Sequence, residues 1–370
     1  MIVTKARDNG LVYLTRELAE WLLSTPRYGS DLGVNVYVDS KLRKSARFDA
    51  PGLRRKEPRF ESMLKYWTPD LCWTSPETFD LVITLGGDGT VLFTSWLFQR
   101  IVPPILAFSL GSLGFLTNFE FSKYKEHLNH IMGDVGMRVN LRMRFTCTVY
   151  RADHIYGDDE LLTIVQADGC ILSTPTGSTA YSLSAGGSLI HPSIPAILLT
   201  PICPHTLSFR PMVLSDTLLL RIAIPPGSRS TAYCSFDGKG RIELCPGDYV
   251  TLEASQYPFP TVVSGGGEWF ESVRRTLCWN VRGAVQKGWS SKSHRPEGEQ
   301  MGLDPMGTPR GQAPEAVADK QDDEEEKWDI DTDSYTDFGQ GTDSGLGPSE
   351  CGDSPGTTSP LKRVMSLLNM

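Results

Sequence analysis

Residues 79–93 of the chain are Phe-Asp-Leu-Val-Ile-Thr-Leu-Gly-Gly-Asp-Gly-Thr-Val-Leu-Phe. The apolar, β-branched run Leu81–Leu85 ends abruptly at the glycines, and the apolar segment Val91–Phe98 follows at once. This order predicts a buried strand, a tight turn and a helix. In an open α/β sheet, such a turn lies at the carboxyl end of a strand, where ligands bind.

The glycines of this turn predict a phosphate site. Gly86, Gly87 and Gly89 leave the backbone bare, so phosphate oxygens can approach its N–H groups, and Thr90 adds a hydroxyl at the start of the helix. Asp88 repels phosphate, so it acts as a base toward a hydroxyl or holds a metal ion between phosphates. The alternative is that Asp88 merely caps the helix.

Charge is distributed unevenly along the 370 residues. Residues 291–370 carry 17 acidic and 7 basic side chains, a net charge of −10, whereas the whole chain carries −8. The remaining body is therefore nearly neutral and has no basic face of the kind that binds nucleic acid. No apolar run reaches the length of a membrane span, and the start lacks a leader pattern, so we expect a cytoplasmic protein without a membrane partner.

The first part of the chain alternates strand and helix patterns. We expect strands at Ile2–Thr4, Val34–Val38 and Pro104–Ser109, with helices at 11–22 and Tyr124–Met132. Residues 41–78 show weak periodicity and predict a loop-rich connection. A second glycine turn, 110–116, follows the strand that ends at Ser109. Residues 1–135 therefore read as a Rossmann-like α/β domain, although they contain neither a Gly-x-Gly-x-x-Gly fingerprint nor a P-loop.

The pattern changes at Val139, where apolar and polar residues alternate for eleven positions and predict one strand, 139–149. Further strands are expected at the following positions: 161–165, 170–172, 196–200, 217–224, 231–236, 249–253 and 260–263. We therefore expect an all-β, sandwich-like domain over 136–265 and a helix within 266–288 that packs back onto it. The acidic, Gly-, Ser- and Pro-rich residues 289–370 predict a disordered tail.

The densest polar run of the body is 166–187, which reads as an Asp-Gly turn, a short strand and a hydroxyl-rich loop. A helix of small residues then begins, with Ser178 or Thr179 as its cap. Hydroxyls and free N–H groups at a helix start suit ribose and phosphate, while small residues admit a flat ring. The same small residues equally allow plain close packing.

Together, the two glycine-rich runs resemble the NAD kinase family of the eukaryotic cytosolic type. The matching stretches are 85–90, 110–117, 168–187, 200–211 and 235–238. The Gly-Gly-Asp-Gly motif alone is shared with lipid kinases and phosphofructokinases, but the run from Asp168 to Gly187 is not. A lipid kinase is the weaker alternative, because the body has no basic or amphipathic membrane-facing stretch.

The resemblance implies transfer of the γ-phosphoryl group of ATP, with Mg²⁺ or another divalent metal, to the 2′-hydroxyl of the adenosine ribose of NAD. Asp88 would take the proton of that hydroxyl, and Gly86, Gly87, Gly89 and Thr90 would receive the phosphates. The expected NAD-binding residues are Asp88, Gly89, Gly111, Asp168, Thr179, Ala180, Tyr181, Ser182, Leu183, Ser184 and Asp237. Members of the family assemble as homo-oligomers. The resemblance assigns no metal ligand.

One feature of the family pattern is missing. An Asn-Glu motif that grips the NAD ribose is expected shortly before the Asp-Gly turn, but residues 149–161 contain no such pair. Several tens of residues are absent by comparison, and their loss would leave neighbouring strands with unpaired edges. The chain is therefore an incomplete gene model of an active kinase, or a catalytically impaired nucleotide-binding subunit that regulates an intact one.

Overall fold

The computed structural model describes residues 1–111, 114–133, 136–151, 162, 164–206, 208–278 and 328–331, together with the backbone of 365–367. The chain divides into two compact units. One comprises Met1–Thr276 with Trp328–Met370, and the other comprises Leu277–Lys327. All the contacts described below lie within the first unit.

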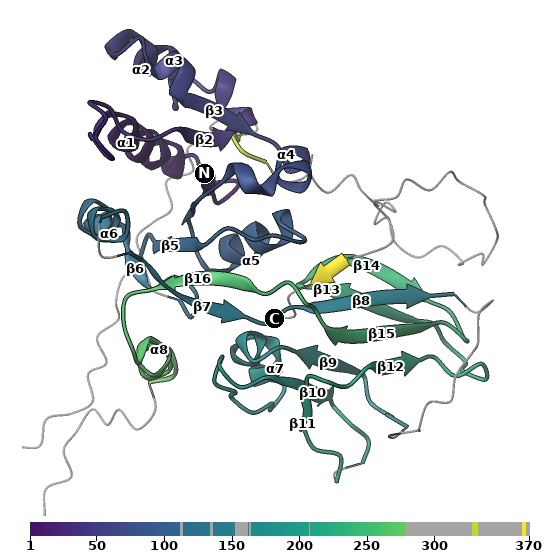
Figure 1. The fold of residues 1–370 in the computed structure, drawn as a ribbon. Coiled ribbons are helices and arrows are strands. Elements are labelled where there is room, and N and C mark those ends of the chain that lie inside the picture. Colours follow the sequence, from purple (N-terminus) through teal and green to yellow (C-terminus); the bar gives the residue numbers. More distant parts are fainter. Residues whose placement is uncertain are drawn as a thin grey trace, which may run out of the picture. The chain divides into compact units, whose positions relative to one another are not determined.

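A six-stranded sheet forms the N-terminal half (Figure 1). Its strands, in spatial order, are β1 (Ile2–Thr4), β4 (Val82–Leu85), β5 (Ile105–Ser109), β16 (Phe259–Val263) and β7 (Arg138–Arg142), with β6 (Phe119–Glu120) paired to β5. The neighbours β1, β4, β5 and β16 run parallel, and β7 runs antiparallel to β16. The carboxyl ends of β4 and β5 therefore meet at one edge of the sheet.

Helices cover both faces of this sheet, as the buried runs of its strands require. Helices α1 (Gly10–Ser24) and α6 (Tyr124–Ile131) contribute to the same hydrophobic cluster as Ile83 and Leu85 of β4. Helix α5 (Asp88–Leu97) packs instead with Val82, because successive side chains of a strand point to opposite faces. The expectation of an α/β domain is thus confirmed.

Residues 41–78 are not the loop-rich connection that the weak periodicity predicts. They contain η1 (Ser40–Lys44), α2 (Ala50–Lys56), α3 (Phe60–Met63), β3 (Leu64–Trp67), α4 (Pro69–Thr74) and η2 (Pro76–Thr78), and β3 pairs in parallel with β2 (Val36–Asp39). Side-chain caps start two of these helices, since Asp49 accepts from the Gly52 N–H and Thr68 from the Leu71 N–H. Elements of four to seven residues are too short to show a helical period in the sequence.

The C-terminal half is rich in antiparallel strands, as expected. One sheet contains β9 (Gly169–Ser173), β10 (Ala196–Ile202) and β11 (Met212–Ser215). A second contains β12 (Leu220–Ala223), β15 (Tyr249–Ala254), β8 (Phe145–Tyr150) and β17 (Met365–Leu367), and β13 (Ala232–Phe236) pairs with β14 (Lys239–Leu244). Buried side chains of β8, β10, β13, β14 and β15 form the core of this half. The expected strand at 161–165 is wrong, because its described residues Leu162, Ile164 and Val165 are exposed and belong to no strand.

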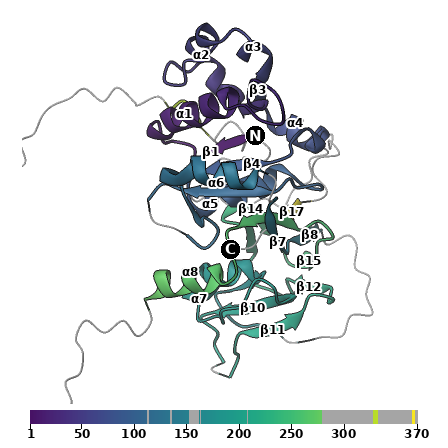
Figure 2. The same ribbon diagram turned by 60° about the vertical axis from the view of Figure 1, so that its left-hand side comes forward.

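Four further helical elements belong to the described fold. They are η3 (Phe121–Lys123), η4 (Thr176–Thr179) with the one-turn α7 (Tyr181–Ser184) after it, and α8 (Glu268–Leu277). Helix α8 is the expected C-terminal helix, and it lies beside the segment that follows α7, where the rings of Trp269 and His191 are 5.0 Å apart (Figure 2).

The alternating stretch 139–149 forms two strands rather than one. Strand β7 ends at Arg142 and β8 begins at Phe145. The alternating pattern predicts that the apolar residues of β7 are buried and the polar ones exposed. The structure shows the opposite, because Leu141 is 65% exposed while Arg142 is 5% exposed. The apolar phase of the pattern continues across the break, so the sequence does not reveal that the chain moves from one sheet to another between these residues.

A buried arginine lies at this break. Arg144 is fully buried, and its guanidinium donates to the carbonyl oxygens of Ser95 (3.1 Å), Phe98 (2.7 Å) and Gln99 (3.1 Å). Burial lowers its pKa to about 10, so the group remains a cation at neutral pH. The cation thus binds the carbonyl groups of Ser95, near the end of α5, and of two residues that follow this helix, and it ties the β7–β8 connection to that end of α5.

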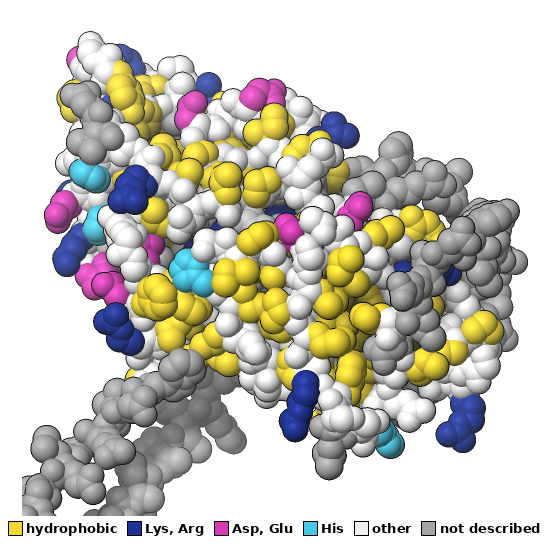
Figure 3. All heavy atoms as spheres, turned by 60° about the horizontal axis from the view of Figure 1, so that its bottom comes forward, with side chains coloured by type: hydrophobic (Ala, Val, Ile, Leu, Met, Phe, Trp, Pro, Cys, Tyr) yellow, Lys and Arg dark blue, Asp and Glu magenta, His cyan; other side chains and the backbone are white. Residues whose placement is uncertain are grey.

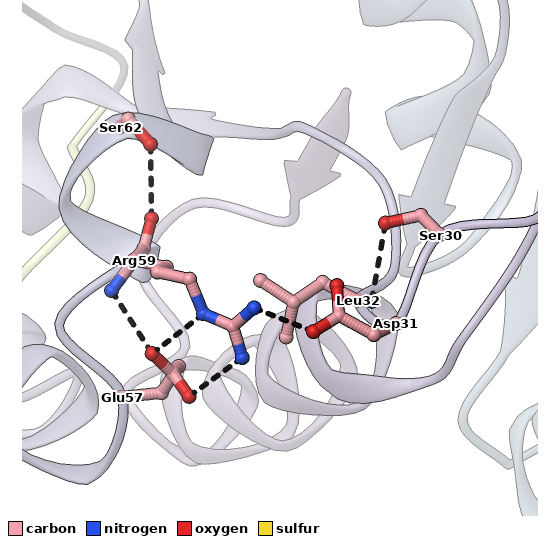
Figure 4. Close-up of polar contacts among 6 residues, drawn as sticks. All are labelled: Ser30, Asp31, Leu32, Glu57, Arg59 and Ser62. Atoms are coloured by element: carbon pink, nitrogen blue, oxygen red, sulfur yellow. Dashed lines mark hydrogen bonds and ion pairs between the residues drawn. The ribbon is translucent and has the colours of Figure 1, made fainter.

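Arginine also forms ion pairs at the surface. Arg59 donates to Asp31 (2.6 Å) and Glu57 (3.0 Å), and so joins the loop after α1 to the link between α2 and α3 (Figure 4). The hydrogen bonds from Arg59 lower the pKa of both carboxyl groups. Because water screens this exposed group, its contribution to stability is small.

We expect Arg144→Met to lower the free energy of unfolding by about 3 to 5 kcal/mol, because several buried carbonyl groups lose their donor. Arg59→Ala, which removes an exposed arginine with two ion pairs, is the matched control and should leave the unfolding midpoint almost unchanged. Denaturant unfolding followed by circular dichroism measures both. Equal midpoints for the two variants would contradict the role given to Arg144.

Candidate active site

Asp88 is the first residue of α5 and lies directly after the turn that ends β4. Its carboxylate accepts hydrogen bonds from the N–H groups of Phe115 (2.9 Å) and Leu116 (3.0 Å) and from the Thr117 hydroxyl (3.2 Å). These donors belong to the second glycine turn, at the end of the neighbouring strand β5. The structure therefore brings the two predicted turns together, and three donors hold the carboxylate in one orientation.

The close approach of the two turns requires glycine at position 114. A Cβ atom on Gly114 would lie 2.2 Å from Oδ1 of Asp88, far inside van der Waals contact. Gly86 has a similar role on the first turn, where a Cβ would lie 2.3 Å from the Thr90 hydroxyl. Both glycines thus make room for neighbouring protein atoms.

Helix α8 supports the second turn from outside. Glu268, its first residue, accepts from the Ser264 hydroxyl (2.6 Å) and, through its other oxygen, from the Asn118 amide (3.1 Å). Two turns later, Arg275 donates to the carbonyl oxygen of Gly114 (3.1 Å). The position of the Asp88 donors therefore depends on a helix about 150 residues further along the chain.

A second buried cation faces this region. The guanidinium of Arg142 donates to the hydroxyls of Thr261 (2.9 Å) and Thr176 (3.3 Å). Burial lowers its pKa to about 10, and the charges of Asp88 and Glu268 act in the opposite direction. Arg142 thus remains a cation at neutral pH. Sequence reasoning missed it because it occupies a polar position of the alternating stretch.

A cavity of about 330 Å³ opens beside the first turn. Its lining residues are Thr4, Lys5, Ala6, Asp39, Trp67, Gly87, Gly89, Thr90, Phe93 and Ile330. Three of the predicted phosphate-binding residues, Gly87, Gly89 and Thr90, are therefore in its wall, whereas Gly86 is not. A Cβ on Gly87 or Gly89 would meet no atom within 4 Å, so the space next to these backbone groups is open. The volume is in the range of small-molecule sites.

The polar run 166–187 places its side chains in two groups. Ser178 and Ser182 are buried and bond within the protein, since Ser178 accepts from the Ile190 N–H (3.0 Å) and the Ser182 and Thr200 hydroxyls are 2.8 Å apart. The other residues of the expected NAD set are accessible. Asp168, Tyr181 and Ser184 are exposed, and Thr179, Ala180 and Leu183 are half-buried. The expected helix is a single turn, and neither Ser178 nor Thr179 caps it.

The two remaining NAD-binding candidates lie in turns. Gly111 is exposed just after β5, and Asp237 occupies the β13–β14 turn in the left-handed conformation, with φ of 49°. The hairpin reaches α5 through Lys239, whose ammonium lies 5.0 Å from the ring centre of Phe93, a cavity residue.

A resident metal site is not found in the part of the chain that the structure describes. None of the described His, Cys, Asp and Glu side chains form a group of three that could hold an ion. The carboxylate of Asp88 is directed to the second glycine turn by its three donors. The described residues therefore do not form a site in which the protein alone holds a divalent metal ion.

Comparison with known proteins identifies the family. The model of the ATP-NAD kinase N-terminal domain matches residues 1–135, and that of the ATP-NAD kinase C-terminal domain matches residues 138–264. The chain belongs to the NAD kinase family. The expectation from the glycine-rich runs is thus confirmed.

Several NAD kinase relatives are similar over most of this chain. The NAD(+) kinase of Saccharomyces cerevisiae is 48% identical over 323 residues, which cover 76% of this chain and 60% of the relative. An uncharacterized kinase of Schizosaccharomyces pombe, C24B10.02c, is 40% identical and is covered to 71%. The crystal structure of yeast NADH kinase complexed with NADH superposes with a TM-score of 0.62 at 29% identity, covering 77% of this chain and 89% of that one.

Length separates this chain from the first of these relatives. The chain spans about 60% of the yeast NAD(+) kinase. The 323 aligned positions also exceed 76% of a 370-residue chain, so part of the aligned relative has no counterpart here. The expected absence of an internal segment near residues 154 and 155 stays a prediction. The interval where the Asn-Glu motif is missing falls mainly on residues 152–161, outside the described residues.

We expect Gly114→Ala to lower ATP-dependent phosphorylation of NAD by about 10- to 100-fold, because the new methyl group must displace the Asp88 carboxylate by an ångström or more. Gly227→Ala, in a turn where a Cβ meets no atom within 4 Å, is the matched control and should keep full activity. A coupled assay of NADP formation measures both. Full activity of Gly114→Ala would show that the packing of Asp88 against the second turn is unimportant.

Proposed function

We propose that this chain is an ATP-dependent NAD kinase, which phosphorylates the 2′-hydroxyl of the adenosine ribose of NAD to give NADP. The observation that carries the proposal is the placement of Asp88. In a chain of the NAD kinase family, this carboxylate is held by three donors at the start of α5, next to a cavity lined by Gly87, Gly89 and Thr90. The weakest of the alternatives from the sequence, a lipid kinase, gains no support from these comparisons.

In the proposed reaction, the oxygen of the 2′-hydroxyl attacks the γ-phosphorus of ATP, and the bond from that phosphorus to the β–γ bridging oxygen breaks. Asp88 takes the proton of the hydroxyl. The free N–H groups at the start of α5 and of Gly87 and Gly89 receive phosphate oxygens, and the ammonium of Lys5 in the same cavity wall adds positive charge. The cation of Arg142 offsets negative charge around Asp88.

Both substrates find candidate contacts in this arrangement. ATP is assigned to the cavity beside the first turn, and NAD to the accessible residues of the second polar run, Asp168 and 179–184, together with Gly111 and Asp237. The divalent cation, Mg²⁺ for example, enters with ATP, because it is bound by the phosphate oxygens of that substrate. No protein ligand is assigned to it.

The proposal also covers the oligomeric state of the protein and its location in the cell. Apolar side chains gather on the face that Figure 3 turns toward the viewer. Val213, Leu218 and Leu219 are among the exposed apolar residues of the β-rich half. Patches of this kind support a homo-oligomer, as the resemblance implies. Among the described residues, no helix is long and apolar enough to cross a membrane. We propose a cytoplasmic location and no nucleic-acid partner.

The decisive experiment is NADP formation by the purified 370-residue chain with NAD, ATP and Mg²⁺. We expect turnover, and we expect Asp88→Asn to reduce it by about 100- to 10,000-fold, since a general base contributes a factor of that order. Asp216→Asn, an aspartate between β11 and β12, is the matched control and should remain active.

Absence of turnover in a folded chain that still binds NAD or ATP would contradict the proposal. It would favour the regulatory subunit instead, because the missing Asn-Glu segment is the feature that an impaired chain would show. Added to an active NAD kinase, such a subunit should then change the rate of that enzyme.

A further inference from the structure

Four residues of the acidic tail pack against the α/β half. They are Trp328–Asp331, which we call the tail strap, and Figure 1 draws them in yellow-green near β2. The tail strap lies outside both stretches that match the family models. It also departs from the expected disordered tail, whose other residues lie outside the described part of the chain except for 365–367.

An apolar side chain anchors the tail strap. Ile330 is 5% exposed and belongs to the same hydrophobic cluster as Leu42 and Phe48. Backbone hydrogen bonds fix its position, since its carbonyl oxygen accepts from the Arg7 N–H at 2.9 Å. The segment is thus held by burial and by backbone pairing.

The two carboxylates that flank Ile330 are each bound by partners of the α/β half. Asp329 accepts from the Ser45 hydroxyl (2.9 Å) and pairs with Arg47 (3.3 Å), while Asp331 pairs with Arg7 (3.1 Å). Neither aspartate lines the cavity. The tail strap therefore contributes an apolar residue to the cavity. Its two negative charges form ion pairs with Arg47 and Arg7, which do not line the cavity.

Ile330 completes a cavity with two chemically different sides. The bare backbone at Gly87 and Gly89 suits phosphate oxygens. The half-buried ring of Phe93 and the almost fully buried apolar residues Trp67 and Ile330 line the rest of the cavity, a lining that suits a planar base. A nucleotide carries both chemistries, and the cavity remains open while the tail strap is docked.

We propose that the tail strap is part of the nucleotide site, with Ile330 packing against the base of the phosphate donor while the glycine turn holds its phosphates. Ile330 is thereby a residue that sets the affinity for ATP, and Asp329 is a positioning residue that acts through it. The inference rests on the proposed function only for the identity of the donor, and it is tested by binding alone.

The experiment measures the binding of ATP, and separately of inorganic tripolyphosphate, to the full chain by isothermal titration calorimetry. Tripolyphosphate occupies the glycine turn but has no base to reach Ile330. We expect Ile330→Ala to weaken ATP binding by about 5- to 20-fold, as the loss of a buried apolar contact does, and to leave tripolyphosphate binding unchanged. Ile101→Ala, which truncates a 60% exposed isoleucine outside the cavity wall, should bind both as the original chain does.

Two further variants separate a contact from a loss of folding. Asp329→Ala removes the partner of Ser45 and Arg47 without touching the cavity wall, and should weaken ATP binding in the same direction but by less. Ile330→Leu keeps the apolar volume and should retain most of the affinity for ATP.

Three results would overturn the proposal. Unchanged ATP affinity in Ile330→Ala and Asp329→Ala would show that the tail strap does not touch the nucleotide. Tighter binding would show that it competes with ATP. An equal loss for ATP and tripolyphosphate would show that it only supports the fold. Since none of these readouts needs turnover, a chain that binds ATP through Ile330 but makes no NADP would refute the proposed function alone.

Discussion

The buried guanidinium of Arg144 is the interaction on which the arrangement of the two halves depends. It leaves water completely, a cost that only good hydrogen bonds can offset, and it donates them to carbonyl groups at and just beyond the end of α5. The other end of the same helix carries Asp88. Any shift of the β7–β8 connection is therefore transmitted along a ten-residue helix to the carboxylate of Asp88.

Helix α5 is also stabilised by charge at each end. A carboxylate at its start and a cation at its finish both complement the helix dipole. Asp88, however, bonds outward to the second glycine turn, so the first backbone N–H groups of the helix are left for a ligand. One residue thus contributes a favourable charge at the helix start and still leaves the anion-binding position open.

The sequence predicts the parts of the site that are made by local chain geometry. The strand Leu81–Leu85 followed by glycines forecasts β4 and the start of α5, since turn chemistry and apolar runs act over a few residues. Arg142 and Arg144 are different, because an alternating pattern shows neither the break after Arg142 nor the cations that become buried there. The sequence does not reveal the burial of Ile330 either, for a related reason. Composition averages over a long window, and one apolar residue among acids disappears in the mean although it packs in the core.

The residues of the candidate site and the residues that support it from outside lie in different parts of the chain. Asp88, the glycine turns and Arg142 all lie within the stretches that match the family models, whereas Glu268 and Arg275 of α8 and the tail strap lie beyond them. The residues outside act on the site through contacts with Asn118, with the Gly114 carbonyl and with the cavity wall. The flanking segments are therefore the places where the support of the second glycine turn and the wall of the cavity can change while Asp88 and the two glycine turns keep their residues.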